Sequence, residues 1–413
     1  MAGRPSIAVA LASLLLLIGS VPSALAGSPG SSTLVVDDDG MASAMDCDAP
    51  DLAFETIGAA VLAASSGDTV KVCPGTYPES VVVDKQLQLL GAQAGVGAER
   101  CQLRSGRESR ITGSPDVGPA SLTLTTTGTV VDGFLISLND GPGISTRETG
   151  SGYRIRHNRI RANSLGIELE TASSVRSYIN RNCIERNNNG LGELPVAGYG
   201  IYSDKQLRNT NINNNGFRDH FTSAVFATGL STSSNISLVR NQSRGDGQFA
   251  RLLVATKVLL LANRVRGDEG DNDGSAIVIG APLGLGTLGL AQGIEVLGND
   301  IGGAYPAGIA VRAAADQVLL RGNTVRGTVI GIEVTAEEPG AVVVRSNRIV
   351  DTRQDGIVLT DATSQNHVVL NHVSGSAALD CVDFSTGPDT AGTANNWRAN
   401  TGATSSPAGL CRP

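Results

Sequence analysis

The sequence has few of the residue types that fill large globular cores or build metal centres. Aromatic residues make up only 3% of its 413 residues, and there are one Trp, four His and three Met. It holds no CxxC pair and no His–Cys cluster, so the ligand spacing of a zinc site is missing. Between Asn158 and Asn371 no run has the 3.6-residue apolar period of a helix. These absences exclude a core in which helices cross between strands, and they argue against a structural metal site.

Basic residues are too few to balance the acidic ones. The chain holds 32 Lys and Arg against 39 Asp and Glu, a net charge of −7. Removal of the leader predicted below takes away one Arg and leaves about −8 (31 basic against 39 acidic residues). Because a negatively charged protein repels the phosphate backbone, nucleic acid is not an expected partner.

Only one long apolar run is present, and it lies at the start of the chain. Residues 8–21 are mainly apolar, follow Arg4 and lead to the small-residue triplet Ala24-Leu25-Ala26. This pattern is typical of a secretory signal peptide and is too short for a membrane span. We therefore predict a signal peptide over residues 1–26 that is cleaved after Ala26, no membrane span, and a secreted or periplasmic protein.

The feature that organises the rest of the chain is an Asn that returns at a near-fixed interval. The repeated residues are Asn158, Asn182, Asn215, Asn241, Asn263, Asn299, Asn323, Asn347 and Asn371. The last four are 24 residues apart, and the residue three positions before each Asn is apolar. The residue two positions after is apolar in every copy except one, where it is Ser243. Self-similarity at this period indicates stacked supersecondary units.

Each clear repeat also contains a Gly followed by alternating apolar residues, as in Gly166-Ile167, Gly308-Ile309 and Gly356-Ile357. Alternation places successive side chains on opposite faces of a strand. Parallel strands without crossover helices can pack if each turn of the chain lies on the previous one, with about 4.8 Å between rungs. We therefore predict an all-β solenoid, a parallel β-helix over residues 69–385.

The repeated Asn residues would occupy the bends of this coil. Stacked amides can bond to the amides above and below, which satisfies a polar group inside the coil. Asn also tolerates the left-handed backbone of a sharp corner. The alternative is that Asn is only a turn former that faces solvent. The apolar residue at plus two favours the inward ladder.

The ends of a β-helix expose strand edges and need caps. Residues 51–64, within an N-terminal cap over 27–68, have the pattern of an amphipathic helix. Four apolar residues could cover the first rung: Leu52, Ile57, Val61 and Leu62. Residues 386–413 form a polar C-terminal tail, in which Trp397 either plugs the last rung or stacks on a sugar.

An even number of cysteines in an exported chain predicts disulfides. The six cysteines are Cys47, Cys73, Cys101, Cys183, Cys381 and Cys411. They allow fifteen pairings. Proximity favours Cys47–Cys73 and Cys381–Cys411, which leaves Cys101–Cys183 by subtraction.

Several short motifs near the start of the predicted coil carry a family resemblance. They are Phe54–Ile57, Ala59–Val61, Gly67–Val70, Pro74–Glu79 and Leu87–Gly91. Together they resemble the opening of secreted right-handed parallel β-helix proteins of the pectin-lyase-like superfamily, which includes pectin methylesterases and NosD-like proteins. The later repeats resemble the carbohydrate-binding and sugar-hydrolase repeats of that group. The resemblance implies a right-handed coil and a polysaccharide or cell-surface glycan, often an acidic one, as ligand.

The resemblance implies lyase, hydrolase, esterase or epimerase chemistry, but no catalytic set can be carried over. The Gln-Asp-Thr, Asn-Thr-Asp, Gly-His-Gly and Asp-Pro-His segments of such enzymes are absent. Asp219-His220 is the nearest echo of a catalytic element and lacks the Pro. Whether the protein is an enzyme therefore stays open.

Alternation predicts outward columns on neighbouring rungs. One column contains Glu168 and Tyr202, and the next contains Glu170 and Asp204. Carboxylates on adjacent rungs, about 4.8 Å apart at the backbone, perturb each other's pKa and suit a general acid and base or a retaining glycosidase pair. They could instead share a divalent cation such as Ca²⁺, although no calcium motif is present. The simpler interpretation is two solvated charges.

Residues 199–221 are the densest in functional types. Lys205 and Arg208 could neutralise a uronate carboxylate, and His220 or Tyr202 could take the neighbouring proton. Glu168, Tyr202 and Asp219 could bind the substrate. The alternative for His220 is a polar residue in a turn.

Two arginines are expected to stack on adjacent rungs near the corner of the coil. They are Arg321 and Arg345, each two residues before its Asn. Guanidinium groups can grip the carboxylates of an acidic glycan, or they can pair with nearby Glu and Asp.

Three functional hypotheses follow. The first is a monomeric protein that binds or processes polysaccharide, as a lyase or glycoside hydrolase if it is an enzyme, without a cofactor. The second is a non-catalytic extracellular or periplasmic scaffold. The third is a NosD-like accessory protein for metal-centre maturation, which the low His and Met content disfavours.

Overall fold

The computed structural model describes residues 31–413, with gaps at 103, 105, 114–119, 173–174, 191–195, 269–273, 282–288, 314 and 337–341, and it leaves out the side chains of 229–232. The predicted signal peptide and its cleavage site lie outside these residues. Ser32–Pro413 form one compact unit. Within the described part of the chain, no helix is long and apolar enough to cross a membrane.

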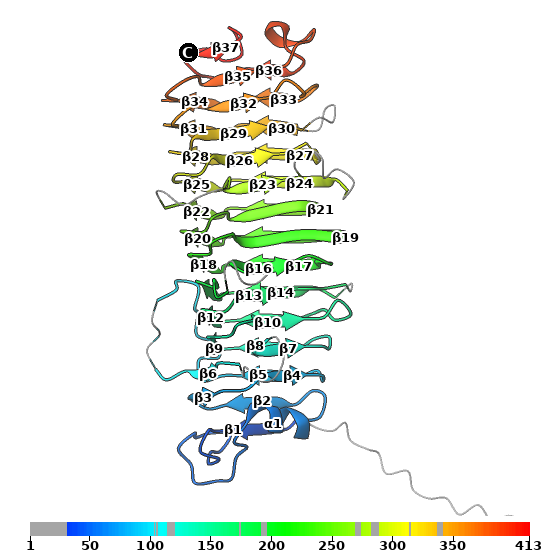
Figure 1. Ribbon diagram of the computed structural model, residues 1–413, viewed down its shortest axis with the longest axis vertical. Helices are drawn as coiled ribbons and strands as arrows, with labels where there is room; N and C mark the ends of the chain where they lie inside the picture. Colours follow the sequence, from blue (N-terminus) through cyan, green and yellow to red (C-terminus); the bar gives the residue numbers. More distant parts are fainter. Residues whose placement is uncertain are drawn as a thin grey trace, which may run out of the picture. The chain divides into compact units, whose positions relative to one another are not determined.

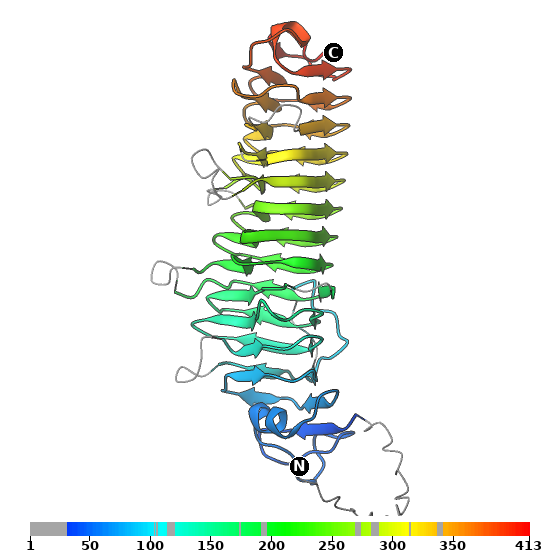
Figure 2. The same cartoon turned by 90° about the vertical axis from the view of Figure 1, so that its right-hand side faces the viewer.

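This unit is a coil of short parallel strands whose turns lie on one another (Figure 1 and Figure 2). Its strands fall on three faces. The first face consists of β4 (Val81–Val83), β7 (Leu122–Leu124), β10 (Pro142–Thr146), β13 (Leu165–Glu168), β16 (Tyr199–Ser203), the start of β19 (Ser223–Val239), the start of β21 (Ala250–Leu261), β23 (Ile277–Ile279), β26 (Ala307–Val311), β29 (Ile330–Val334), β32 (Ile357–Leu359), β35 (Cys381–Asp383) and β37 (Ser405–Ser406).

The second face follows the first along each turn of the chain. It consists of β1 (Thr33–Val36), β2 (Thr69–Val72), β5 (Gln88–Leu90), β8 (Val130–Asp132), β11 (Arg154–Arg156), β14 (Ser177–Asn180), β17 (Arg208–Asn213), the ends of β19 and β21, β24 (Ala291–Leu297), β27 (Ala315–Arg321), β30 (Val342–Arg345), β33 (His367–Val369) and β36 (Asn396–Arg398).

The third face closes each turn. It consists of β3 (Gly75–Tyr77), β6 (Ser109–Ile111), β9 (Phe134–Ser137), β12 (Arg159–Arg161), β15 (Cys183–Glu185), β18 (Gly216–Arg218), β20 (Gln242–Arg244), β22 (Arg264–Arg266), β25 (Asp300–Gly302), β28 (Thr324–Arg326), β31 (Arg348–Val350) and β34 (His372–Ser374).

The register places equivalent positions of successive repeats opposite each other. On the second face Ile155 pairs with Ile179 and Ile179 with Ile212, and on the third face Ile160 pairs with Ile184. All five side chains are fully buried. They belong to one apolar core that extends from Val36 to Cys411. The predicted parallel β-helix is therefore confirmed.

The Asn ladder is also confirmed, and it lies inside the bend between the second and third faces. Asn158 donates to Asn182 Oδ1 twice, from Nδ2 at 3.2 Å and from its backbone N at 3.0 Å. The same two bonds join every later pair of ladder residues and continue one step further, from Asn371 to Asn400. No ladder side chain from Asn158 to Asn371 is more than 2% exposed. Each amide is buried and satisfied.

The corner itself is made by the residue before each ladder Asn. Residues His157, Arg181 and Asn214 have φ of 54°, 54° and 52°, and Gly298 and Gly322 occupy the equivalent position with φ of 60° and 66°. The ladder residues do not have positive φ. The expectation that Asn itself supplies the left-handed conformation is therefore wrong, because its role is to hold the stack while its neighbour makes the bend.

The bend between the third and first faces contains a shorter polar stack that the sequence analysis missed. Asn139 N donates to Asn163 Oδ1 at 3.2 Å, and Asn163 Nδ2 donates to Asn187 Oδ1 at 2.9 Å. Asn187 Nδ2 then lies 3.2 Å from His220 Nε2. Like the long ladder, this stack lets polar groups occupy a dry corner.

The N-terminal helix is shorter than the amphipathic segment predicted over residues 51–64. Its helix α1 covers Ile57–Ala63 and begins at Thr56, whose side chain accepts a hydrogen bond from Ala59 N. Ile57 and Val61 are buried as expected, but Leu52 is 97% exposed and Leu62 80% exposed. The prediction that these two leucines cover the first rung is wrong, since Leu52 precedes the helix and Leu62 lies on its outer side.

The C-terminal end is closed by the only Trp. Trp397 lies on β36, is 5% exposed and donates from Nε1 to Asp383 Oδ2 at 2.7 Å. Its ring is therefore part of the core at the last rungs and is not available to stack on a sugar.

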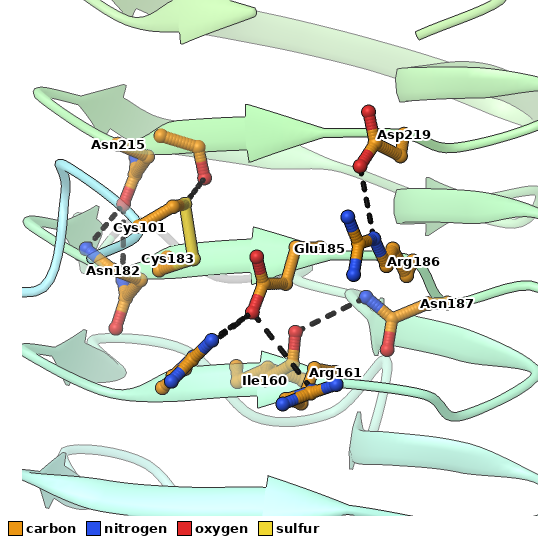
Figure 3. Close-up of a disulfide and its surroundings, with 12 residues drawn as sticks. Cys101, Ile160, Arg161, Asn182, Cys183, Glu185, Arg186, Asn187, Asn215 and Asp219 are labelled. Atoms are coloured by element: carbon orange, nitrogen blue, oxygen red, sulfur yellow. Dashed lines mark hydrogen bonds and ion pairs between the residues drawn. A yellow bond between two sulfur atoms is a disulfide. The ribbon is translucent and has the colours of Figure 1, made fainter. Parts of the chain in front are cut away.

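All three predicted disulfides are present: Cys47–Cys73, Cys101–Cys183 and Cys381–Cys411. The Cys101–Cys183 disulfide anchors residues 92–102, here called the strap, against the third face (Figure 3). Ala98 N donates to Arg181 O at 3.1 Å, and Gly216 lies so close to the backbone of Glu99 that a Cβ there would stand 2.1 Å from its carbonyl oxygen. The strap thus reaches as far as β18 and no side chain larger than hydrogen fits beneath its end.

Candidate functional site

The predicted outward column on the first face exists. Glu168 pairs with Tyr202 and Tyr202 with Phe226, on β13, β16 and β19. Phe226 in turn pairs with Arg251 on β21. A carboxylate, two aromatic rings and a guanidinium therefore follow one another along successive rungs.

Next to Glu168, the first face is hollowed into a cleft of about 300 Å³. It is lined by Ser80, Val81, Val82, Ala120, Thr123, Ser145, Thr146, Arg147, Glu148, Glu168, Glu170 and Lys205. Three carboxylates and two cations thus surround a small hollow on the outside of β4, β7, β10 and β13. A site with both charges can bind hydroxyl groups and carboxylates of a polar ligand.

Internal contacts already orient part of this lining. Ser145 Oγ donates to Glu168 Oε2 at 2.6 Å, and Lys205 Nζ lies 3.5 Å from Glu148 Oε1. The side chains of Lys205 and Glu148 are 54% and 51% exposed. Both therefore remain accessible to solvent and to a ligand.

Glu170 does not face outward as predicted. It is 2% exposed, and its carboxylate accepts hydrogen bonds from the backbone N of Asp204, Lys205 and Gln206 and from Ser203 Oγ, at 2.6–3.3 Å. Burial raises the pKa of Glu170 to about 7, although these hydrogen bonds oppose the shift. The side chain holds the turn after β16 from inside, at the floor of the cleft.

The expected pair of exposed carboxylates on adjacent rungs is therefore wrong. Glu170 meets the backbone of Asp204, and the Asp204 side chain instead accepts a hydrogen bond from Tyr202 Oη at 3.2 Å. Burial, with Asp204 next in importance, raises the pKa of Tyr202. A raised pKa keeps this phenol protonated, which makes Tyr202 a hydrogen-bond donor and no proton acceptor at neutral pH.

His220 lies inside the coil, and the prediction that it meets a substrate is wrong. Its side chain has no exposed surface. Nδ1 lies 2.7 Å from Asp246 Oδ1 and Nε2 lies 3.2 Å from Asn187 Nδ2. Because the Asn187 Nδ2 group can only donate, His220 accepts at Nε2 and donates from Nδ1 to Asp246. The ring continues the short polar stack.

The remaining predicted residues are divided between faces. Asp219 forms an ion pair with Arg186 at 2.9 Å, beyond the end of β18, and Arg208 begins β17 on the second face. Only Glu168, Glu170 and Lys205 line the cleft, with Tyr202 and Asp204 beside it. Residues 199–221 therefore do not form a single site, because the chain bends twice within this segment and passes from the first face to the second and the third.

An aromatic cluster adjoins the cleft. The rings of Tyr202 and Phe226 are stacked with centroids 5.2 Å apart, and the Tyr199 centroid lies 5.0 Å from that of Tyr202 and 5.3 Å from that of Phe226. The Arg251 guanidinium lies 5.8 Å from the Phe226 centroid. Tyr199 and Arg251 were missed from the sequence, although their positions opposite Ser223 and Phe226 follow from the strand register.

Two groups of three potential metal ligands occur among the described residues. They are Asp37 with Cys47 and Cys73, and Glu185 with Cys101 and Cys183. In both groups the cysteines are joined in a disulfide, so they offer no thiolate. Glu185 moreover accepts from Arg159 at 2.6 Å. Neither group fits a metal centre.

Comparison with known proteins agrees with the architecture. The family model described as "Right handed beta helix region" matches residues 269–396. An alginate lyase from Paenibacillus sp. str. FPU-7 has a similar structure, with 13% identity and a TM-score of 0.52 over 75% of this chain and 99% of that one. The catalytic unit of a GH87 α-1,3-glucanase from Streptomyces thermodiastaticus strain HF3-3 is similar over 93% of this chain and 71% of that one, with 14% identity and a TM-score of 0.57.

A search of curated protein sequences finds no match. At 13% and 14% identity, the structural likeness concerns the fold and carries no residue roles. The chain has the right-handed parallel β-helix fold that its opening motifs predict.

Proposed function

We propose that the protein works outside the cytoplasm and binds a polysaccharide along its first face. The observation that carries the proposal is the continuity of two surfaces there, the charged cleft around Glu168 and the partly exposed rings of Tyr199 and Tyr202, which pack on the buried Phe226. A sugar ring presents an apolar face that can lie on an aromatic ring and hydroxyl groups that carboxylates can accept from.

Two further observations support this proposal. The similar structures named above are those of an alginate lyase and an α-1,3-glucanase, both proteins that act on polysaccharides. The three disulfides are typical of proteins in an oxidising compartment, which is where the predicted signal peptide would direct the chain.

Within the cleft the carboxylates have different proposed roles. Glu168 faces outward and accepts one hydrogen bond from Ser145, so its other oxygen is offered to a ligand. Glu170 is already engaged by three backbone N–H groups and one hydroxyl, and its role is to fix the turn that carries Lys205. If the bound polysaccharide is cleaved, Glu168 and Glu148 are the carboxylates that reach it.

A panel of neutral and acidic polysaccharides tests this proposal, with both binding and product formation measured. Tyr202→Ala is expected to weaken binding roughly 2–12-fold, which corresponds to about 0.5–1.5 kcal/mol for one aromatic contact. Its matched control is Tyr178→Ala, which removes a half-exposed outward ring from β14 on the second face. Glu168→Gln is compared in the same way with Glu295→Gln on the second face.

The outcomes separate the hypotheses. Loss of binding in the first-face variants alone supports the site, and shortened or unsaturated products identify an enzyme. Binding that is unchanged in Tyr202→Ala and Glu168→Gln places the site elsewhere. If wild-type protein binds none of the polysaccharides, the proposal is wrong and the scaffold hypothesis replaces it.

A further inference from the structure

The third face carries an arginine surface that the proposed function does not use. On β18, β20 and β22, Arg218 pairs in register with Arg244, and Arg244 with Arg266. The same column continues through Gly302 on β25 to Arg326 on β28. The three consecutive guanidinium groups therefore start from backbone positions only about 4.8 Å apart.

A second column runs parallel to the first, two residues earlier in each strand. It contains Arg264 on β22, Asp300 on β25 and Arg348 on β31. The outward positions from β18 to β31 thus hold six arginines and one carboxylate, in a chain whose net charge is −7. We refer to these six arginines as the arginine surface: Arg218, Arg244, Arg264, Arg266, Arg326 and Arg348.

Internal partners do not account for this charge. Asp300 pairs with both Arg266 and Arg326. Among the described residues, Arg218, Arg244, Arg264 and Arg348 have no ion pair or side-chain hydrogen bond. All four are exposed or half-exposed. Like charges opposite each other across strands destabilise a sheet, so the arginine surface contributes no evident stability of its own.

The preceding rungs of the third face, β12 and β15, show the contrast. There Arg159 and Arg161 occupy the same two columns, and Glu185 lies 2.6 Å and 3.9 Å from them (Figure 3). Glu185 is 3% exposed. The earlier arginines of these columns thus share a buried carboxylate, and the unpaired arginines begin at β18, where the strap ends. In Figure 1, β18 to β31 lie one above another beyond the strap.

We propose that the arginine surface binds a linear acidic polysaccharide of the polyuronate class, laid along the axis of the coil. A guanidinium group grips a planar carboxylate with two parallel N–H donors, and a polymer with one carboxylate per sugar can offer such groups to successive rungs. Binding removes the mutual repulsion of the arginines. This surface is separate from the first-face site, so either can exist without the other.

Two observations favour a polyuronate over nucleic acid. None of the outward residues from β18 to β31 is aromatic, so bases have no ring on which to stack. The rest of the chain is acidic and repels a densely charged phosphate backbone. A flexible polymer with fewer charges per unit length can follow the narrow arginine columns and stay away from the acidic parts of the surface.

The test measures binding of the full chain to sodium polygalacturonate, with dextran as the neutral probe and single-stranded oligo(dT) as the nucleic-acid probe. The double variant Arg218→Glu/Arg244→Glu removes two unpaired arginines and breaks no internal pair. Its control, Arg154→Glu/Arg398→Glu, makes the same change in net charge at two exposed arginines of the second face.

We expect wild-type protein to bind polygalacturonate and not to bind dextran. Its affinity for polygalacturonate should fall as ionic strength rises, because the charged contacts are exposed. The Arg218→Glu/Arg244→Glu variant should bind about tenfold more weakly or worse, whereas the control should bind like wild type.

Three results would overturn the proposal. Equal losses in the two charge variants would show that only net charge matters. Undetectable binding of polygalacturonate would remove the ligand class. Binding of oligo(dT) as tight as that of polygalacturonate, lost in the same variant, would assign the surface to nucleic acid instead.

Discussion

The most direct test of the architecture is the replacement of Asn347 by Leu, at the centre of the regular part of the ladder. Asn347 Oδ1 accepts from Asn323 N and Asn323 Nδ2, both within 3.0 Å, and Asn347 Nδ2 donates to Leu320 O and Asn371 Oδ1. The side chain is 2% exposed. Leu has the same number and branching of side-chain heavy atoms but can make none of these bonds.

The expected decrease in the free energy of unfolding depends on which polar groups lose their last hydrogen-bond partner. Asn323 Nδ2 keeps Val296 O, and Asn371 Oδ1 keeps Asn347 N, but Asn323 N is left with no acceptor in a dry corner. One unsatisfied buried donor lowers the free energy of unfolding by about 1–3 kcal/mol. Urea denaturation followed by far-ultraviolet circular dichroism measures this change. The matched control is Asn396→Leu, at an exposed position of β36, which should be nearly neutral.

The variant Asn347→Asp sharpens the test. An ionised carboxylate there would face Leu320 O and Asn371 Oδ1, which are both acceptors, so the folded state favours the protonated form and raises the pKa of the introduced Asp. A raised folded-state pKa means that the variant gains stability as pH falls through that pKa towards the unfolded value. If Asn347→Leu unfolds at the same urea concentration as wild type, or Asn347→Asp shows no recovery in acid, the buried ladder is not what holds these rungs together.

Two further predictions concern Glu170 and the strap. Since burial raises the pKa of Glu170 to about 7 from its ordinary 4.5, the native state holds a proton that the unfolded chain releases between these values. The free energy of unfolding should therefore fall as pH rises from about 4.5 to about 7, by at most about 1.4 kcal/mol per pH unit, and Glu170→Gln should lose this slope in urea titrations at several pH values. An identical slope in both proteins would contradict the buried position. Replacement of Cys101 and Cys183 by Ser should lower the free energy of unfolding by about 2–4 kcal/mol. Hydrogen exchange should then increase in β9, β12 and β15 but not in β31, and an unchanged pattern would show that the strap does not stabilise these rungs.

The repeat was readable from the sequence because the coil repeats the same local environment. The apolar residues at minus three and the Asn at zero face the interior in each rung, so their spacing reports the fold directly, and even the Ser243 exception lies buried within the register. The disulfides followed from proximity because the caps are local. Asn400, which extends the ladder by 29 residues from Asn371, was missed since the last loop is longer than the regular repeat.

The site was harder to predict because alternation holds only within a strand. β13 ends at Glu168, so Leu169 and Glu170 lie in a turn and are both buried, and the outward direction assigned to Glu170 had no physical basis. The prediction for His220 was wrong for a different reason. Asn163 and Asn187 already form a second series 24 residues apart, and continuing that series to the next rung would have placed His220 in the same dry corner.

The arginine surface was also visible in principle. Four of its six residues stand three positions after ladder residues, as Arg218 does after Asn215 and Arg244 after Asn241. The other two, Arg264 and Arg348, stand one position after a ladder Asn. The arginines predicted to stack were Arg321 and Arg345, and the structure does place these in register on β27 and β30. What the sequence did not reveal is that the earlier members of the same columns, Arg159 and Arg161, pair with the buried Glu185, whereas Arg218 and Arg244 have no such partner among the described residues.

The disulfide between Cys101 and Cys183 also decides what happens when the backbone is broken. The two cysteines are 82 residues apart, and the intervening chain builds every strand from β6 to β14. A protease that cuts once anywhere in that stretch would produce two fragments that remain covalently linked and still share their stacked edges. On a non-reducing gel the nicked molecule would migrate as one species, and its halves would part only after a thiol reagent opened the link.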